Sequence, residues 1–115
     1  MKFKVNETYY FVPRDTRTKP CEVKVSKIGK KYVYFEGCGY QYDMDIEAMI
    51  LLNYGVRGNV FYSEEHYNSY KEALDYWHKI TYFRDNLPSI SEIKQFTKLL
   101  KKVQEFEKNV LEEQV

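Results

Sequence analysis

The side chains that most often carry out catalysis are scarce in this chain, and their spacing keeps them apart. His66 and His78, the two histidines, are twelve positions apart on one predicted helix, or about 18 Å along its axis, so they cannot share a metal ion. The sequence contains no glycine-rich phosphate loop, no GxSxG motif and no Cys–His arrangement. We therefore expect a protein that is not an enzyme and needs no cofactor, with His66 packed on the buried edge of its helix, the side on which Trp77 lies.

The strongest pattern for metal binding is an acidic run with alternate spacing, Asp43, Asp45 and Glu47. Carboxylates at i and i+2 share one face of an extended strand, and oxygen ligands suit hard cations. The glycine and the spacing of an EF-hand loop are absent, so we interpret the run as an acidic strand edge that resists aggregation. Cys21 and Cys38 form no CxxC motif, and we expect reduced thiols and no metal site.

Aromatic side chains are unusually frequent, with 12 Tyr, 7 Phe and 1 Trp in 115 residues. The period of two in a strand places Tyr32 and Tyr34 on one face, and Val33 and Phe35 on the other. We expect Val33 and Phe35 in the core and the tyrosines on an outer surface, although tyrosine also packs on core faces. The candidate partner-binding residues are Tyr32, Tyr34, Tyr40 and Tyr42 on strands, and Tyr76, Tyr82 and Phe83 on the first helix.

Those three helical aromatics lie outside the main apolar stripe of their helix. They either pack against the second helix or remain exposed. Exposed aromatic side chains are enriched at protein–protein hot spots, because they offer a large contact area with few rotatable bonds.

Basic side chains are concentrated near the N-terminus, although the whole chain has 18 Lys and Arg against 17 Asp and Glu. Residues 2–31 contain nine basic and three acidic residues, a net +6, whereas residues 32–65 contain one Arg and six acids. One interpretation is a patch that contacts phosphates. The other is that solvated loops and outward strand positions simply carry lysine. The candidate patch consists of Arg14, Arg17, Lys19, Lys27, Lys30 and Lys31.

Residues 1–62 have the pattern of short strands joined by tight turns. Apolar, aromatic and β-branched residues alternate with polar ones, and Gly29-Lys30 fits a type II′ hairpin turn. Residues 44–52 fit either a strand or a short helix. Five or six short strands in about 60 residues predict a small SH3-like antiparallel barrel. The expected strands are 8–12, 21–28, 31–36, 40–43 and 59–62.

Residues 63–85 and 89–112 each have the periodicity of an amphipathic helix. Ser63 is a typical N-cap residue, and Ser89 with Glu92 forms the S-x-x-E pattern of a capping box. The apolar positions are Tyr67, Tyr70, Leu74, Trp77 and Thr81 in the first helix, and Ile93, Phe96, Leu100, Val103 and Val110 in the second. We predict a helical hairpin, and for the whole chain one α+β domain, residues 1–115.

The N-terminal sequence has no apolar segment of the kind found in secretory signals. The longest apolar run, residues 48–52, is far shorter than a membrane span. We therefore expect a cytoplasmic protein without a membrane partner.

Three stretches of the chain are similar to a set of small bacteriophage-encoded β-barrel proteins. The first two, residues 8–25 and 27–35, contain a strand, a polar loop ending in Lys-Pro, and a Lys-Ile-Gly-Lys-Lys-Tyr hairpin. The third, residues 59–65, runs from a strand into a capped helix. The resemblance covers residues 1–75, and the tail from Asn86 departs from it. It implies a barrel and a phage origin, and it identifies no catalytic residue.

Small phage accessory proteins commonly bind and disable host proteins, including defence nucleases. Our leading hypothesis is therefore a non-enzymatic phage protein that binds a host protein, for example a CRISPR nuclease that it inhibits. The alternative is a nucleic-acid-binding module that uses the basic hairpin and the strand tyrosines. A third hypothesis is a homodimer that forms through the second helix.

Overall fold

The computed structural model describes residues 2–15, 17–37, 39–51 and 57–113, and side-chain surroundings up to residue 107. Contacts within the chain divide it into two compact units, Met1–Ser63 and Glu64–Val115. The boundary lies next to the predicted end of the β part at residue 62. The expectation that both units belong to one domain stays a prediction.

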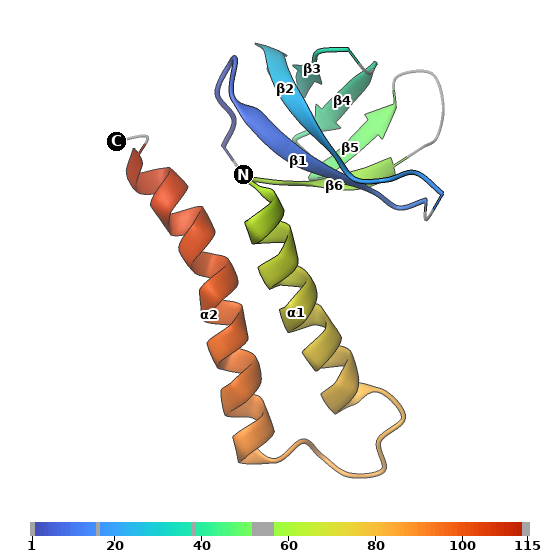
Figure 1. Cartoon of the computed structure of the whole chain (residues 1–115), viewed down its shortest axis with the longest axis vertical. Helices are drawn as coiled ribbons and strands as arrows, with labels where there is room; N and C mark the ends of the chain where they lie inside the picture. The colour runs from blue at the N-terminus through green and yellow to red at the C-terminus, as the bar shows by residue number, and fades with distance from the viewer. Residues whose placement is uncertain (1, 16, 38, 52–56, 114–115) are drawn as a thin grey trace. The chain divides into compact units, whose positions relative to one another are not determined.

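The first unit is a closed antiparallel barrel of six strands in the order β1-β2-β3-β4-β5-β6 (Figure 1). Pairing of β1 with β6 closes it. The strands are β1 (Thr8–Pro13), β2 (Cys21–Ile28), β3 (Tyr32–Phe35), β4 (Tyr40–Asp43), β5 (Ala48–Leu51) and β6 (Arg57–Phe61). This confirms the predicted α+β class, a small antiparallel barrel followed by a helical hairpin. Of residues 44–52, which fitted either a strand or a helix, 44–47 form a turn and 48–51 form the strand β5, whereas residue 52 lies outside the described residues.

The barrel core is built from the inward positions of all six strands. β1 and β2 alternate as their sequences predict, with Tyr9, Phe11, Val23 and Val25 buried. Val33 and Phe35 are buried as expected. The remaining members of this core are Tyr42, Met49 and Val60.

The segment before β1 also packs on the core, which the sequence patterns did not indicate. The Phe3 ring lies 4.7 Å from the ring of Tyr42 and 4.8 Å from that of Tyr9, measured between centroids. Backbone bonds hold the segment in place, since the Asn6 amide donates to the Val25 carbonyl at 2.9 Å.

The turn between β2 and β3 differs from the predicted type II′ geometry. That turn needs a positive φ at Gly29, but Gly29 does not adopt one. Its amide donates instead to the Tyr32 carbonyl at 2.8 Å, so the two lysines between them occupy the bend. The prediction of a glycine-first turn is therefore wrong, because the bend begins one residue later.

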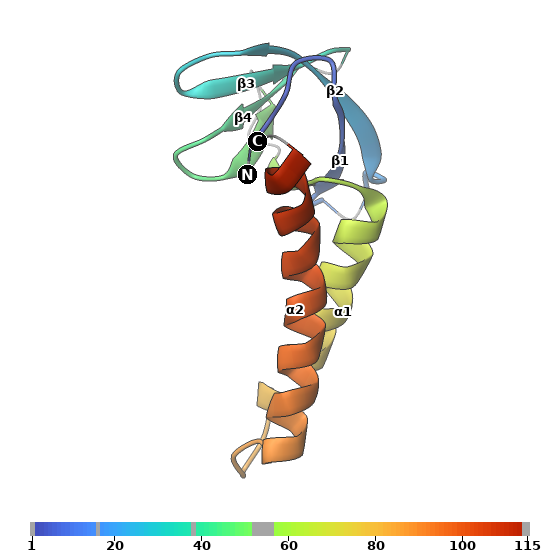
Figure 2. The same cartoon turned by 90° about the vertical axis from the view of Figure 1, so that its left-hand side faces the viewer.

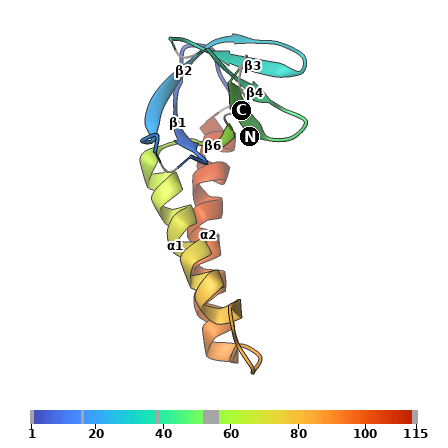
Figure 3. The ribbon, with the colours of Figure 1, turned by 90° about the vertical axis from the view of Figure 1, so that its right-hand side faces the viewer.

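The second unit is a hairpin of two antiparallel helices, α1 (Glu64–Thr81) and α2 (Ile90–Glu113) (Figures 2 and 3). Ser89 and Glu92 form the predicted capping box: the Glu92 amide donates to the Ser89 hydroxyl, and the Ser89 amide donates to the Glu92 carboxylate, each at 3.1 Å. The Arg84 guanidinium donates two hydrogen bonds to the same carboxylate, at 2.6 and 3.1 Å.

α1 ends four residues earlier than the predicted boundary at 85 because Phe83 has a φ of 50°, which is incompatible with a continuing helix. The buried residues of the helices are His66, Ser69, Ala73 and Ile80 on α1 and Val103 on α2. Among the described residues, neither helix combines the length and the apolar character needed to cross a membrane.

Candidate functional site

An irregularity in β2 redirects one lysine on the β2–β3 hairpin. After the pair Val25–Phe35, the register of the two strands shifts by one residue. Lys27 pairs with Tyr34, so Ser26 is an extra residue in β2, a β-bulge. The Ser26 hydroxyl donates a hydrogen bond to the Tyr34 carbonyl at 3.2 Å. Strict alternation would turn Lys27 inward, like Val25, whereas the bulge places it beside Tyr34 on the outer face.

Two tyrosine rings and two lysine ammonium groups lie together on this outer face. The ring centroids of Tyr32 and Tyr34 are 6.4 Å apart, in an edge-to-face arrangement. The Nζ of Lys31 lies 5.3 Å from the Tyr32 centroid, and the Nζ of Lys27 lies 6.0 Å from the Tyr34 centroid. Both rings are half-buried and both lysines are exposed. We call these four residues the Lys–Tyr face.

The electrostatics of the Lys–Tyr face are mixed near Lys31. Hydrogen bonding to the Tyr32 side chain raises the pKa of Lys31, and the carboxylates of Asp43 and Asp45 raise it further. Lys31 therefore stays protonated at neutral pH. The same carboxylates place negative charge next to a surface that is otherwise basic.

The structure separates the six predicted basic residues into two groups, although all six are exposed. Arg14, Arg17 and Lys19 belong to the β1–β2 loop, whereas Lys27, Lys30 and Lys31 belong to or border the β2–β3 turn. These segments lie at opposite ends of β2, an eight-residue strand of about 26 Å (Figure 1). Only the second group is brought together with Tyr32 and Tyr34.

Tyr40 and Tyr42 face the core instead of the outer surface, which corrects the sequence-based expectation. Tyr42 pairs with Val33, and directly paired residues of antiparallel strands share a face, so Tyr42 is buried with Val33. Burial raises the pKa of Tyr42 to about 12. Tyr40 packs on the core, with its ring centroid 4.7 Å from that of Phe11.

The three aromatics predicted on the first helix have different surroundings. Tyr76 is half-buried on α1, and the Nζ of Lys79 lies 5.8 Å from its ring centroid. Tyr82 and Phe83 lie just beyond the end of α1, and Phe83 is 93% exposed. Their rings touch edge-to-face, 4.4 Å apart. Leu87 and Ile90, which the sequence analysis did not select, are also strongly exposed. We call Tyr82, Phe83, Leu87 and Ile90 the hairpin tip.

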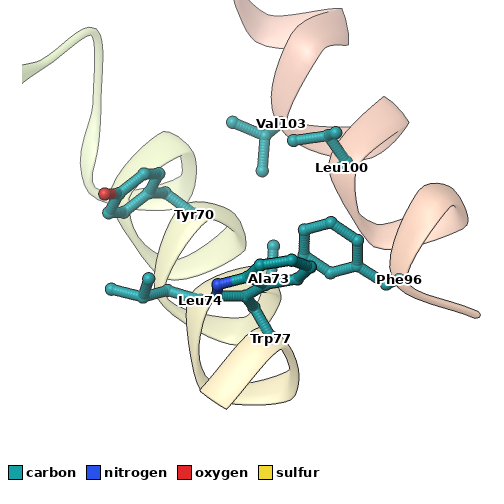
Figure 4. A pocket seen from close by; sticks show the side chains of 7 residues that line it. All are labelled: Tyr70, Ala73, Leu74, Trp77, Phe96, Leu100 and Val103. Atoms are coloured by element: carbon teal, nitrogen blue, oxygen red, sulfur yellow. The ribbon is translucent and has the colours of Figure 1, made fainter. Parts of the chain in front are cut away.

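An apolar groove of about 280 Å³ runs between the two helices (Figure 4). The rings of Trp77 and Phe96 meet across it with centroids 5.0 Å apart. Trp77 is 45% exposed, although it belongs to the predicted apolar stripe of α1. The groove is lined by Tyr70, Ala73, Leu74 and Trp77 of α1 and by Phe96, Leu100 and Val103 of α2.

His66 packs inside the helical hairpin, and the acidic run Asp43, Asp45 and Glu47 lies at the end of β4 and in the turn that follows. His66 is buried as predicted, stacks on Phe106 with centroids 5.5 Å apart, and has its pKa lowered by burial. The run is not a strand edge: Asp43 ends β4, and its carboxylate accepts the Asp45 amide at 2.9 Å at the start of the 44–47 turn. In the part of the chain that the structure describes, no group of three or more His, Cys, Asp or Glu could hold a metal ion.

Of the two cysteines, Cys21 begins β2 and is exposed, whereas Cys38 lies outside the described residues.

A family model described as the phage ProQ C-terminal-like domain matches residues 1–112. The chain belongs to the phage ProQ C-terminal-like domain family. Membership in this family confirms the phage association expected from the strand and hairpin sequences. It also corrects the extent of the resemblance, because the family match continues through both helices, past residue 75 and past Asn86. No curated protein and no solved structure matches the chain.

Proposed function

We propose that this phage protein is a non-enzymatic module that binds single-stranded nucleic acid through the Lys–Tyr face. In this proposal Tyr32 and Tyr34 stack on bases, and Lys27 and Lys31 contact the phosphates on either side. Lys30, exposed in the turn between β2 and β3, extends the basic surface.

The observation that carries the proposal is the close placement of two aromatic rings and two ammonium groups on one outward face. Proteins that bind single strands combine cationic tracks along the backbone with aromatic rings on which bases stack. Each such stacking contact contributes about 1–3 kcal/mol, and every base has a π-face, so binding needs little sequence preference. Membership in the phage ProQ C-terminal-like family supports a nucleic-acid-related role.

A titration of the full chain with fluorescently labelled single-stranded RNA and DNA tests this proposal. We expect binding that weakens steeply as salt increases, because each phosphate contact releases counterions. Replacing Tyr34 with Ala should weaken binding by roughly tenfold or more, through loss of one stacked base. Replacing Lys27 with Ala should weaken binding and reduce the salt slope by about one.

Matched control variants come from residues outside this face. Tyr82→Ala removes an exposed tyrosine from the hairpin tip, and Lys19→Ala removes an exposed lysine from the far end of β2. Both should bind as the unmodified protein does. Equal losses from the control and the test variants would reject the assignment of the site, and the absence of salt-dependent binding would reject the function.

The second candidate function is the binding of a host protein through the hairpin tip, including inhibition of a defence nuclease. It is favoured by the exposure of two adjacent aromatic side chains and two aliphatic ones in one loop region. Aromatic side chains that protrude in this way fill pockets at the centres of protein interfaces.

A pull-down from a bacterial lysate treated with nuclease tests this second function, using the unmodified protein and the double variant Tyr82→Ser, Phe83→Ser. A host protein that binds only the unmodified chain would support it, and inhibition of a CRISPR nuclease by the purified chain would specify it. Identical recovery with both proteins would exclude the hairpin tip as the binding surface.

A further inference from the structure

The residues that line the apolar groove of the helical hairpin carry no charge. The six charged residues of α1 fall within an arc of about 120° at 100° per residue. Tyr70, Leu74 and Trp77 lie on the opposite side of the helix. On α2 the exposed lysines occupy a similar arc, and Phe96 and Leu100 lie opposite them. Two acids of α2, Glu92 and Glu107, also lie on the side of Phe96 and Leu100, one before and one after the groove along the helix. Whatever covers this face must itself be uncharged, because an ion buried there would lose its hydration.

Each helix has two separate rows of packing residues. On α1, Ala73 and Ile80 are buried in the hairpin, while Leu74 and Trp77 form a second row beside them. On α2, Val103 is buried, while Ile93 and Leu100 remain exposed in a row spaced by seven residues. A spacing of seven is the repeat by which helices pack side by side in bundles. Two rows on each helix are what a four-helix bundle requires, since every helix there contacts two neighbours.

We infer that the apolar groove is the dimer interface of this protein, and that its occupant is the same face of a second copy. The second helical hairpin supplies what the groove requires, an apolar strip on two helices with matching rows of side chains. In such a pairing each Trp77 packs against the other chain, and a two-fold axis relates the two identical faces.

The available area fits a weak dimer that forms as the protein concentration rises. The 18 residues of α1 extend about 27 Å, and two adjacent helices are about 20 Å wide, giving roughly 500 Å² on each copy. The total of roughly 1,000 Å² reaches the lower limit for a specific interface, and its apolar character resembles that of homodimers.

Light scattering and fluorescence of the full chain, measured from about 1 to 100 μM, test the inference. We expect the mass to rise toward twice the 13.9 kDa of one chain. Trp77 is the only tryptophan, so its emission reports directly on the groove. The emission should shift to shorter wavelength over the same concentration range, because dimer formation removes the indole from water.

Ile93→Glu and Ile46→Glu are a matched pair of variants, because the two side chains are 50% and 51% exposed. Ile93 lies in the exposed row of α2, whereas Ile46 lies in the 44–47 turn of the barrel. We expect Ile93→Glu to raise the dissociation constant of the dimer at least about tenfold, and Ile46→Glu to leave it unchanged. Circular dichroism checks that both variants retain their helices.

Three outcomes would overturn the inference. The first is a mass of one chain throughout the concentration range. The second is a dimer that forms without any change in Trp77 emission, which would mean that another surface joins the copies. The third is a dimer that Ile93→Glu does not weaken.

Discussion

Gly58 and Phe83 are two positions where the backbone limits which side chain fits. Gly58 is buried in β6 opposite Pro13, and a Cβ there would lie 2.5 Å from the Val12 carbonyl oxygen and against the Phe11 ring. Phe83 has the left-handed φ that usually belongs to glycine at the end of a helix. Its ring contacts that of Tyr82 but is otherwise in water, so little packing offsets the strained backbone.

Replacing Gly58 with Ala should lower the free energy of unfolding by about 1–3 kcal/mol, because Phe11 and β1 must move to admit the methyl group. Urea titration measures the change. Gly29→Ala is the control, since a Cβ at Gly29 would lie 3.2 Å from the Tyr32 carbonyl oxygen, a contact that small shifts relieve. Equal stability of the two variants would contradict the tight packing described for Gly58.

Replacing Phe83 with Gly should raise the free energy of unfolding relative to Phe83→Ala by about 0.5–1 kcal/mol. Both variants lose the aromatic ring, but only Gly removes the steric cost of the left-handed conformation. Thermal unfolding of the two variants gives the difference. If Phe83→Ala were the more stable variant, the end of α1 could not have the geometry described.

An ion pair between Arg84 and Glu92 joins the loop of the helical hairpin to the start of α2. The Glu92 carboxylate also belongs to the capping box of α2. The Arg84 guanidinium and the Ser89 backbone amide hold the pKa of Glu92 to about 2, well below its ordinary value of 4.5. Because the folded-state pKa is depressed, the stabilising effect is complete above the unfolded-state value. It disappears as pH falls toward 2.

The melting temperature of the unmodified protein should therefore exceed that of Glu92→Gln at neutral pH, with the difference shrinking between pH 4.5 and pH 2. Gln retains the reciprocal hydrogen bonds of the capping box, so the comparison isolates the charge. Asp85→Asn, an exposed acid of the same loop, is the control. A difference that stays constant with pH would show that the ion pair does not stabilise the fold.

The distribution of charge over the protein matters more for its proposed function than the net value of +1. The six basic residues predicted as a patch lie in two groups, and only the group at the β2–β3 turn lies beside Tyr32 and Tyr34. Asp45 lies close enough to influence Lys31, so this cluster is partly neutralised within the same molecule. Binding of a phosphate backbone should respond mainly to nearby charges. At 0.1 M salt, exposed charges more than about 10 Å apart are largely screened from one another.

Asp45→Asn and Asp85→Asn change the net charge by the same amount, but only the first acts near the Lys–Tyr face. We expect Asp45→Asn to raise the affinity for single-stranded nucleic acid about two- to fivefold at low salt. Asp85→Asn should leave the affinity unchanged. Anisotropy titrations measure both effects, and equal gains would mean that net charge, not the Lys–Tyr face, governs binding.

Local sequence patterns were sufficient to predict those features of the structure that depend on a few consecutive residues. Alternation placed Val33 and Phe35 in the core, and the S-x-x-E spacing located the cap of α2. The same period of two put Tyr32 and Tyr34 on an outer face. These features depend on one strand or one helical turn, so no distant contact is needed to establish them.

Long-range pairing decided the features that local patterns missed. The barrel register turned Tyr42 inward, because its partner Val33 faces the core. The bulge at Ser26, which exists only relative to β3, brought Lys27 beside Tyr34. On the helices, the amphipathic stripe was evident from the sequence, but the contact between α1 and α2 determined that Ala73 and Ile80 are buried while Trp77 remains half in water. Which face of a strand or helix is buried depends on the elements that pack against it. When those elements are distant in sequence, only the tertiary structure shows which ones they are.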